Sequence, residues 1–278
     1  MMTPGVFART YAAKYPGDLF ARIRADGFAS VQFNLSCAGL AALPETLVPG
    51  VGEGIAEAAR ENGLTLCALS GTYNMAHPDP SRRLRDRAGF TNVMRAAREM
   101  DVSLVTLCTG SRDPSNMWRA HPDNGSVEAW SALRGELDFV LSLAEEFNLV
   151  LGIEPEPGNV IADARLARKI LDEANSKRLG IVLDAANLLP PEAQPRQAEI
   201  VAEAAELLGG SLFLVHAKDI DRHGIVVPAG KGAVDLPAFV ARMKSVGYDG
   251  PLVGHNFEES DAPGVATYLA SIIRSQAS

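Results

Sequence analysis

Short apolar segments alternate with longer amphipathic segments along the whole chain. Eight segments of five or six residues, the first of them weakly marked, have the apolar character of strands that are buried on both faces. Each segment is followed by a longer stretch with the spacing of an amphipathic helix or by a polar loop. We predict strands at residues 5–10, 31–35, 64–69, 104–108, 149–154, 179–184, 212–217 and 251–255.

The predicted helices lie between these strands. The two clearest apolar stripes run through residues 82–100 and 126–147. Asp163 and Asp235 directly precede two other helical stretches, and their side chains are expected to cap them. The remaining helices are predicted at residues 19–25, 50–60, 200–208 and 265–273.

This alternation predicts parallel strands that are joined by crossover helices. Eight such units favour a single (β/α)8 TIM barrel over an open sheet, and 278 residues suit that fold. We see no Pro/Ser/Gly-rich linker and therefore predict one domain, residues 1–278. The chain has neither the G-x-G-x-x-G signature after its first strand nor a G-x-x-x-x-G-K-[ST] loop, which argues against a dinucleotide-binding or P-loop fold.

Composition and charge narrow the range of partners. The formal net charge is −8 and basic residues form no cluster, so nucleic acid is not the expected partner. No apolar run approaches the roughly 18 residues that span a bilayer. We read no signal peptide, and three widely spaced cysteines with apolar neighbours suggest buried thiols in a reducing compartment. The expected location is the cytoplasm.

Chemically active side chains stand at the ends of consecutive predicted strands. In a barrel these ends face one mouth, where TIM-barrel sites are built. Four such residues, one at each of strands five to eight, are separated by 30, 32 and 39 positions. Two carboxylates and two imidazoles suit a divalent ion such as Mn²⁺, Co²⁺, Mg²⁺ or Zn²⁺ better than a metal that prefers thiolates. The predicted metal ligands are Glu154, Asp184, His216 and His255.

Four motifs give the chain a resemblance to a known family. They are GIEPEPGN, VLDAAN, VHAKD and GYDGPLVGH, at or after strands five to eight. With these motifs the chain resembles the xylose isomerase-like superfamily of sugar isomerases and epimerases, in particular ketose 3-epimerases, hydroxypyruvate isomerase and inosose dehydratases. The resemblance implies metal ligation by Glu154, Asp184 and His216, and substrate contact by Arg222.

The chain departs from the family pattern at two positions. The family has a glutamate at the end of strand eight, where this chain has His255, and that glutamate pairs with the strand-five glutamate to move protons in the epimerases. His255 can still ligate or titrate, or Glu258 or Glu259 reaches back to the site. Asn187 stands where many members have a substrate-binding histidine, and it is expected to bind a substrate hydroxyl although it cannot titrate.

Other polar residues are weaker candidates. Lys218 follows His216 by two positions and is predicted to bind substrate from the same side, and Glu156 is expected either to order the metal site or to bind substrate. The long loop after strand four offers Arg112 and Trp118 as residues that cover the mouth and bind and select the substrate. Asn74 and His77 are further candidates at the mouth, whereas residues 230–232, Gly-Lys-Gly, are read as a turn.

Three functional hypotheses follow. The first is a metal-dependent isomerase or epimerase of a ketose-like sugar or sugar phosphate, with Glu154 and His255 as the proton-transferring residues and an enediolate intermediate. The second is a lyase or dehydratase that uses the same intermediate. The third is a barrel without catalysis that binds metal and sugar.

A DNA-repair endonuclease is disfavoured by five histidines and the acidic charge. By analogy with the family, a homo-oligomer is expected.

Overall fold

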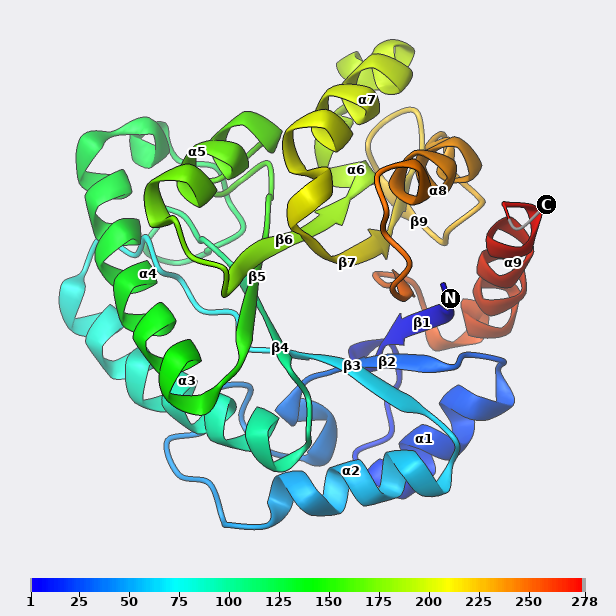
Figure 1. Cartoon of the computed structure of the whole chain (residues 1–278), viewed down its shortest axis with the longest axis horizontal. Helices are drawn as coiled ribbons and strands as arrows, with labels where there is room; N and C mark the ends of the chain where they lie inside the picture. The colour runs from blue at the N-terminus through cyan, green and yellow to red at the C-terminus, as the bar shows by residue number, and fades with distance from the viewer. Residues whose placement is uncertain (1, 277–278) are drawn as a thin grey trace.

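The computed structural model describes residues 2–276, which fold around a closed barrel of eight parallel strands (Figure 1). Neighbours in the barrel follow one another in the sequence, and the last strand pairs with the first. This architecture confirms the predicted single TIM barrel. The barrel strands are β1 (Pro4–Phe7), β2 (Ser30–Phe33), β3 (Thr65–Ser70), β4 (Leu104–Cys108), β5 (Val150–Glu154), β6 (Leu179–Asp184), β7 (Leu212–Ala217) and β10 (Leu252–Gly254).

Helices surround the ring of strands (Figure 1). Three of them begin at a side-chain cap: the side chains of Ser126, Asp163 and Asp235 each accept a hydrogen bond from a backbone N–H in the first turn. None of the helices in residues 2–276 is long and apolar enough to cross a membrane. The main helices are α1 (Pro16–Ala25), α2 (Val51–Glu61), α3 (Pro80–Glu99), α4 (Val127–Phe147), α5 (Ala164–Ala174), α7 (Gln197–Leu208), α8 (Leu236–Ser245) and α9 (Ala262–Ser275).

The strands at the seam of the barrel are shorter than predicted. The first strand ends at Phe7, because the chain turns into a 3₁₀ helix, Ala8–Thr10, whose carbonyl at Ala8 accepts from the N–H of Tyr11. Strand two ends at Phe33 because the Asn34 side chain caps a second 3₁₀ helix. By contrast, β4, β6 and β7 have the predicted bounds.

Two elements at the barrel mouth have no counterpart in the predicted pattern. A one-turn helix, α6 (Ala185–Leu188), begins directly after β6. Beyond β7, the strands β8 (Asp219–Ile220) and β9 (Val226–Val227) form a small antiparallel hairpin. Both are too short to give a periodic signal of their own.

A buried carboxylate holds the base of the hairpin loop. Asp219 is fully buried, and its side chain accepts hydrogen bonds from the backbone N–H groups of Ile220, Gly230, Gly232 and Val234. A Cβ at Gly232 would lie 2.2 Å from Oδ1 of Asp219, so this close approach requires glycine. The segment 230–232 is therefore a turn, as predicted.

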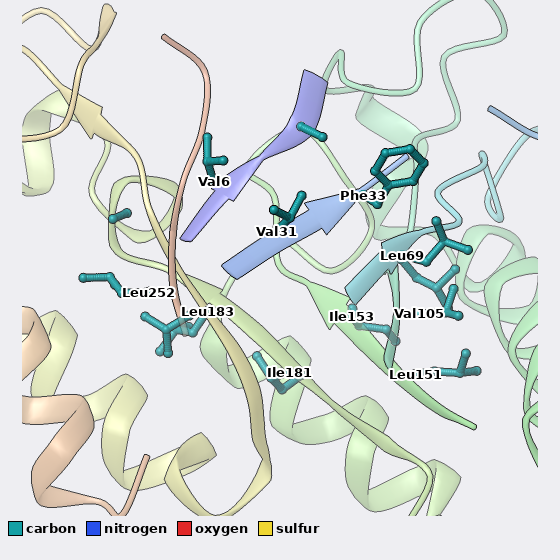
Figure 2. Packing of buried hydrophobic residues seen from close by; sticks show 14 of the residues in the cluster. Val6, Val31, Phe33, Leu69, Val105, Leu151, Ile153, Ile181, Leu183 and Leu252 are labelled. Carbon is teal, nitrogen blue, oxygen red and sulfur yellow. The ribbon is translucent and has the colours of Figure 1, made fainter. Parts of the chain in front are cut away.

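Successive residues along each strand face different layers of the barrel. Val31, Leu151 and Ile153 belong to the large core (Figure 2). This core also contains buried residues of the surrounding helices. Val182 and Leu214, at alternate positions, pack with residues of other strands in a separate cluster inside the barrel. The next alternate positions, two residues further along β6 and β7, carry the chemistry described below. The regular side-chain period thus places a polar layer directly above an apolar floor.

Candidate functional site

Four side chains of metal-ligand type converge at the carboxyl end of the barrel. Each offers a ligand atom, and these atoms all lie within 4.8 Å of one another. Three come from the last two residues of β5, β6 and β7, and the fourth follows β10 by one residue. All four are buried, with at most 7% of their surface exposed. The residues are Glu154, Asp184, His216 and His255.

The four residues form two hydrogen-bonded pairs. Nδ1 of His216 lies 3.1 Å from Oε1 of Glu154. Nε2 of His255 lies 2.9 Å from Oδ2 of Asp184. The two imidazole rings are neighbours, with centroids 4.6 Å apart and an interplanar angle of 55°.

Asp184 serves the backbone as well as the cluster. Its Oδ1 accepts a hydrogen bond of 2.9 Å from the N–H of Ala186 and so caps α6, while Oδ2 faces His255. A strand-end aspartate often caps the next helix, and here the same carboxylate does this and also joins the cluster. The position of this carboxylate is therefore fixed by local backbone structure.

Two polar side chains support the carboxylates. Asn187, in α6, donates from Nδ2 to Oε1 of Glu154 over 3.1 Å. The ammonium group of Lys218 donates to Oδ1 of Asn187 and lies 3.8 Å from Oδ2 of Asp184. Lys218 is buried and directed to the same side as His216, as the sequence predicts.

Mutual charge interactions keep both carboxylates ionised. Burial alone would raise the pKa of Glu154, but the charge and hydrogen bond of His216 outweigh burial and lower it. Burial would also raise the pKa of Asp184, but the charge of Lys218 and the hydrogen bond from His255 lower it to about 2. Both groups are thus in the anionic form that binds a cation.

The two histidines differ in charge preference. Burial opposes protonation of both rings. For His216 the charge of Glu154 prevails and raises the pKa, whereas for His255 burial and the neighbouring charge of His216 lower it. Burial would also lower the pKa of Lys218, but the charge of Asp184 raises it.

The cluster opens into a cavity of about 740 Å³ at the barrel mouth. Glu154, His216 and His255 lie in its wall, and Lys218 and Glu156 also line it. Burial and the nearby charge of Glu154 raise the pKa of Glu156 to about 7. A cavity of this size suits a small polar molecule such as a monosaccharide.

The structure places the other predicted site residues unevenly. Trp118 lines the cavity and remains 51% exposed, so it lies at the rim. The side chain of Arg112 donates to the carbonyl of Ala76 and does not line the cavity. Arg222, carried away by the β8–β9 hairpin, lines a different cavity beside Lys231.

The two glutamates that were alternatives to His255 lie in different places. Glu258 lies at the exposed rim of the cavity. Glu259 instead accepts from the N–H of Ala12 and pairs with Arg22, away from the cluster. Asn74 and His77 do not line the cavity either: Asn74 is bound to the backbone of Ser111, and the ring of His77 contacts the carbonyl of Pro114.

Several cavity residues were not predicted. Gln32 and Thr106 are buried polar residues from β2 and β4, and Cys108 ends β4 beside Glu154. Burial raises the pKa of the Cys108 thiol well above its ordinary value, which keeps it neutral. A glutamine or threonine inside an otherwise apolar strand is a usable signal, because such a side chain needs a polar partner in the barrel.

The donor set fits a divalent cation. Two buried carboxylate oxygens and two imidazole nitrogens within one small volume are ligands that Mn²⁺, Co²⁺, Mg²⁺ or Zn²⁺ accepts. Glu154, Asp184, His216 and His255 would hold the ion. The hydrogen bonds from Asn187 and from the backbone of α6 orient the carboxylates before binding, as outer partners do in metal sites.

The sequence profile of the xylose isomerase-like TIM barrel family matches residues 20–275. The chain belongs to this family. A sequence comparison with curated proteins finds no significant match.

Solved structures of the family share the fold. The apo form of the 3-keto-D-glucoside 4-epimerase YcjR from E. coli is 18% identical, covers 99% of this chain and 100% of its own, and has a TM-score of 0.77. A D-tagatose 3-epimerase-like protein is 17% identical over 99% and 98% of the two chains, with a TM-score of 0.78. The IolI protein with a bound zinc atom is 17% identical over 99% of each chain, with a TM-score of 0.75. The chain spans 43% of a xylose isomerase-like TIM barrel/4-hydroxyphenylpyruvate dioxygenase fusion protein, which is 16% identical and has a TM-score of 0.74.

Proposed function

We propose that the chain is a divalent-metal-dependent isomerase or epimerase of a ketose-like sugar or sugar phosphate. The observation that carries this proposal is the convergence of two carboxylates and two imidazoles, three of which lie in the wall of a cavity large enough for a monosaccharide. Similar structures carry the names of a keto-glucoside epimerase and a tagatose epimerase-like protein, and another holds zinc. These names support the substrate class.

The proposed chemistry starts with the removal of a proton. A divalent ion at the site would supply positive charge beside the carbonyl and hydroxyl oxygens of the substrate and so stabilise an enediolate. Glu154, ionised and facing the cavity, is the assigned proton acceptor. His255, whose lowered pKa favours the neutral ring, lies across the cluster and is the assigned partner for proton return, with Glu258 at the rim as the alternative.

The remaining residues are assigned to substrate binding. Lys218 and Glu156 line the cavity with groups that can hold sugar hydroxyls, and Trp118 offers an aromatic face at the rim. Asn187 holds Glu154 in place. Arg112 and Arg222 stay predicted substrate contacts, and their positions outside the cavity lining give this prediction no support.

The test is turnover of ketoses and ketose phosphates by the metal-loaded protein. Glu154→Gln should fold normally and lose activity by roughly 10²- to 10⁴-fold, the usual contribution of a positioned acid–base group. Glu146→Gln, an exposed change on α4, is the matched control and should keep full activity. Full activity in Glu154→Gln would refute the mechanism.

A lyase or dehydratase is the second candidate, and His255 is the observation that favours it. An imidazole stands where a second carboxylate is expected, and elimination does not need two equivalent bases on opposite faces of the substrate. NMR of products formed in D₂O separates the two reactions. An isomerase gives isomers that carry solvent deuterium, whereas a lyase gives products that have lost water or another leaving group.

A barrel that binds metal and sugar without turnover would retain metal after purification and bind ketoses in the same screen without converting them.

Five other expectations stay predictions from the sequence: the single domain, the cytoplasmic location, the homo-oligomer, the absence of a nucleic-acid partner and a place in carbohydrate metabolism.

A further inference from the structure

Gln32 is a polar residue in the middle of a buried strand. All four residues of β2 are buried, and Gln32 is 3% exposed. Its Oε1 lies 2.7 Å from Nε2 of His216. The strands β2 and β7 are not neighbours, since β1 and β10 lie between them, so this hydrogen bond crosses the interior of the barrel.

The other end of the same amide is also used. Nε2 of Gln32 donates to Oγ1 of Thr106 over 3.2 Å, and Thr106 is buried on β4. The amide therefore presents its oxygen, an acceptor, to His216. An acceptor at this position requires that Nε2 of His216 carries a hydrogen.

The ring of His216 is thereby divided between two tasks. The carboxylate of Glu154 at Nδ1 and the amide oxygen of Gln32 at Nε2 are both acceptors, so Nδ1 gives up its proton when it ligates an ion, and the ring is then neutral with its N–H on Nε2. Nε2 is occupied by Gln32, whereas Nδ1 faces Glu154, on the side of the ligand cluster. The hydrogen bond to Gln32 also prevents the ring from turning about its Cβ–Cγ bond.

We propose that Gln32 is the positioning residue of the metal site, which holds His216 in the tautomer and orientation that presents Nδ1 to the ion. This inference rests on the proposed metal site and adds Gln32, which is not one of the four proposed ligands. Outer partners of metal-ligating histidines usually contribute roughly 10- to 100-fold to metal affinity.

Two substitutions at Gln32 separate a role as hydrogen-bond acceptor from a role in filling space. In Gln32→Glu, one carboxylate oxygen still accepts from Nε2 of His216 and the other accepts from the hydroxyl of Thr106. In Gln32→Met, the side chain has a similar length but no strong acceptor. We expect Gln32→Glu to bind Zn²⁺ or Co²⁺ within about threefold of the wild type or more tightly, and Gln32→Met to bind roughly 10- to 100-fold more weakly.

A residue that only fills space would give the reverse order. Methionine would then be tolerated and a buried carboxylate would weaken binding. Metal dissociation constants from competition with a chromophoric chelator measure this order directly. Equal affinity in Gln32→Met and the wild type, or weaker binding in Gln32→Glu than in Gln32→Met, would overturn the inference.

A second measurement needs no variant. Long-range ¹H–¹⁵N spectra of the zinc-loaded wild type should show Nε2 of His216 as the protonated nitrogen and Nδ1 as the metal-bound nitrogen. The opposite assignment would also overturn the inference. If the wild type binds no divalent ion at all, the proposed function fails first, so the two failures are distinguishable.

Discussion

The rings of His216 and His255 lie 4.6 Å apart, and each is bound to a different carboxylate, Glu154 for the first and Asp184 for the second. Each of two neighbouring imidazoles thus has its own acidic partner. A divalent ion held at this site would bind the carboxylate and imidazole groups that form these two pairs. The two pairs bring four groups of metal-ligand type within 4.8 Å of one another.

Metal binding should stabilise the fold, and Asp184→Asn should abolish this effect. A ligand at 100 times its dissociation constant adds about 2.7 kcal/mol to the free energy of unfolding. The asparagine oxygen can still accept from the N–H of Ala186, so α6 keeps its cap while the anionic ligand is lost. Thermal unfolding with and without Zn²⁺, Mn²⁺ or Co²⁺ measures the effect.

Asp235→Asn provides the matched control for that experiment. Asp235 also caps a helix, α8, but takes no part in the ligand cluster. This variant should keep the full metal-dependent rise in melting temperature. A normal metal response in Asp184→Asn would remove Asp184 from the site.

Lys218→Met should tighten metal binding and reduce turnover. The ammonium group lies 3.8 Å from Oδ2 of Asp184, so it competes with a cation for the same carboxylate. Removal of this like charge should increase affinity on the order of tenfold, or ~1.4 kcal/mol. The proposed substrate contact and the anchor of Asn187 are lost together, so turnover is expected to fall. Lys231→Met, at an exposed position, should change neither quantity. Weaker metal binding in Lys218→Met would show that the lysine supports the ligands.

Glu136→Gln should destabilise the protein more than any surface ion pair does. Glu136 is 4% exposed between α3 and α4 and pairs with Arg83 and Arg87, and its carboxylate accepts from the hydroxyl of Tyr73. Loss of one partner from a buried pair costs about 3 kcal/mol. Chemical denaturation measures the free energy of unfolding.

The surface pair of Glu203 with Arg165 supplies the comparison for Glu136. Both side chains are well exposed, and such pairs contribute roughly 0–1 kcal/mol. Glu203→Gln should therefore fall within that range. Equal losses in Glu136→Gln and Glu203→Gln would mean that burial does not strengthen the network.

The loop after β4 should lose stability in acid because of Asp113. Hydrogen bonds from the backbone and hydroxyl of Ser115 lower the pKa of Asp113 from 3.8 to about 2. A carboxyl group with a lowered folded-state pKa stabilises the fold above its ordinary pKa, and this contribution is lost as the pH falls from 3.8 towards 2.

Asp113→Asn, which cannot ionise, isolates this contribution. The difference in free energy of unfolding between wild type and variant should be constant from pH 7 to about pH 5 and shrink below it. Chemical denaturation at a series of pH values gives the difference. A pH-independent difference would show that the charge of Asp113 is not the cause.

Most of the barrel and the convergence of the four proposed ligands could be predicted because both depend on regular spacing. A buried parallel strand is a continuous apolar run, and a charged residue at its end lies at the mouth. This reasoning located Glu154, Asp184 and His216 within their strands. It extended strand eight by one residue to His255, which did not affect the prediction that this side chain joins the others.

The rest depended on contacts between distant segments. The hydrogen bond of Gln32 to His216 joins residues 184 positions apart, and no local pattern contains it. The expectation that Arg222 contacts substrate came from the resemblance to the family. The β8–β9 hairpin, which rests on the backbone contacts of Asp219, carries it to a different cavity. Local patterns thus located the four cluster residues but neither the contact with Gln32 nor the course of the hairpin.

The anchor at Asp219 has a consequence for how this barrel can change. One carboxylate closes the base of the hairpin loop through four backbone N–H groups, whatever side chains occupy the tip between Asp221 and Gly230. The tip can therefore be exchanged as a cassette, by evolution or by an engineer, without refolding the barrel beneath it. The sequence of the tip can change there while the ligand cluster stays intact.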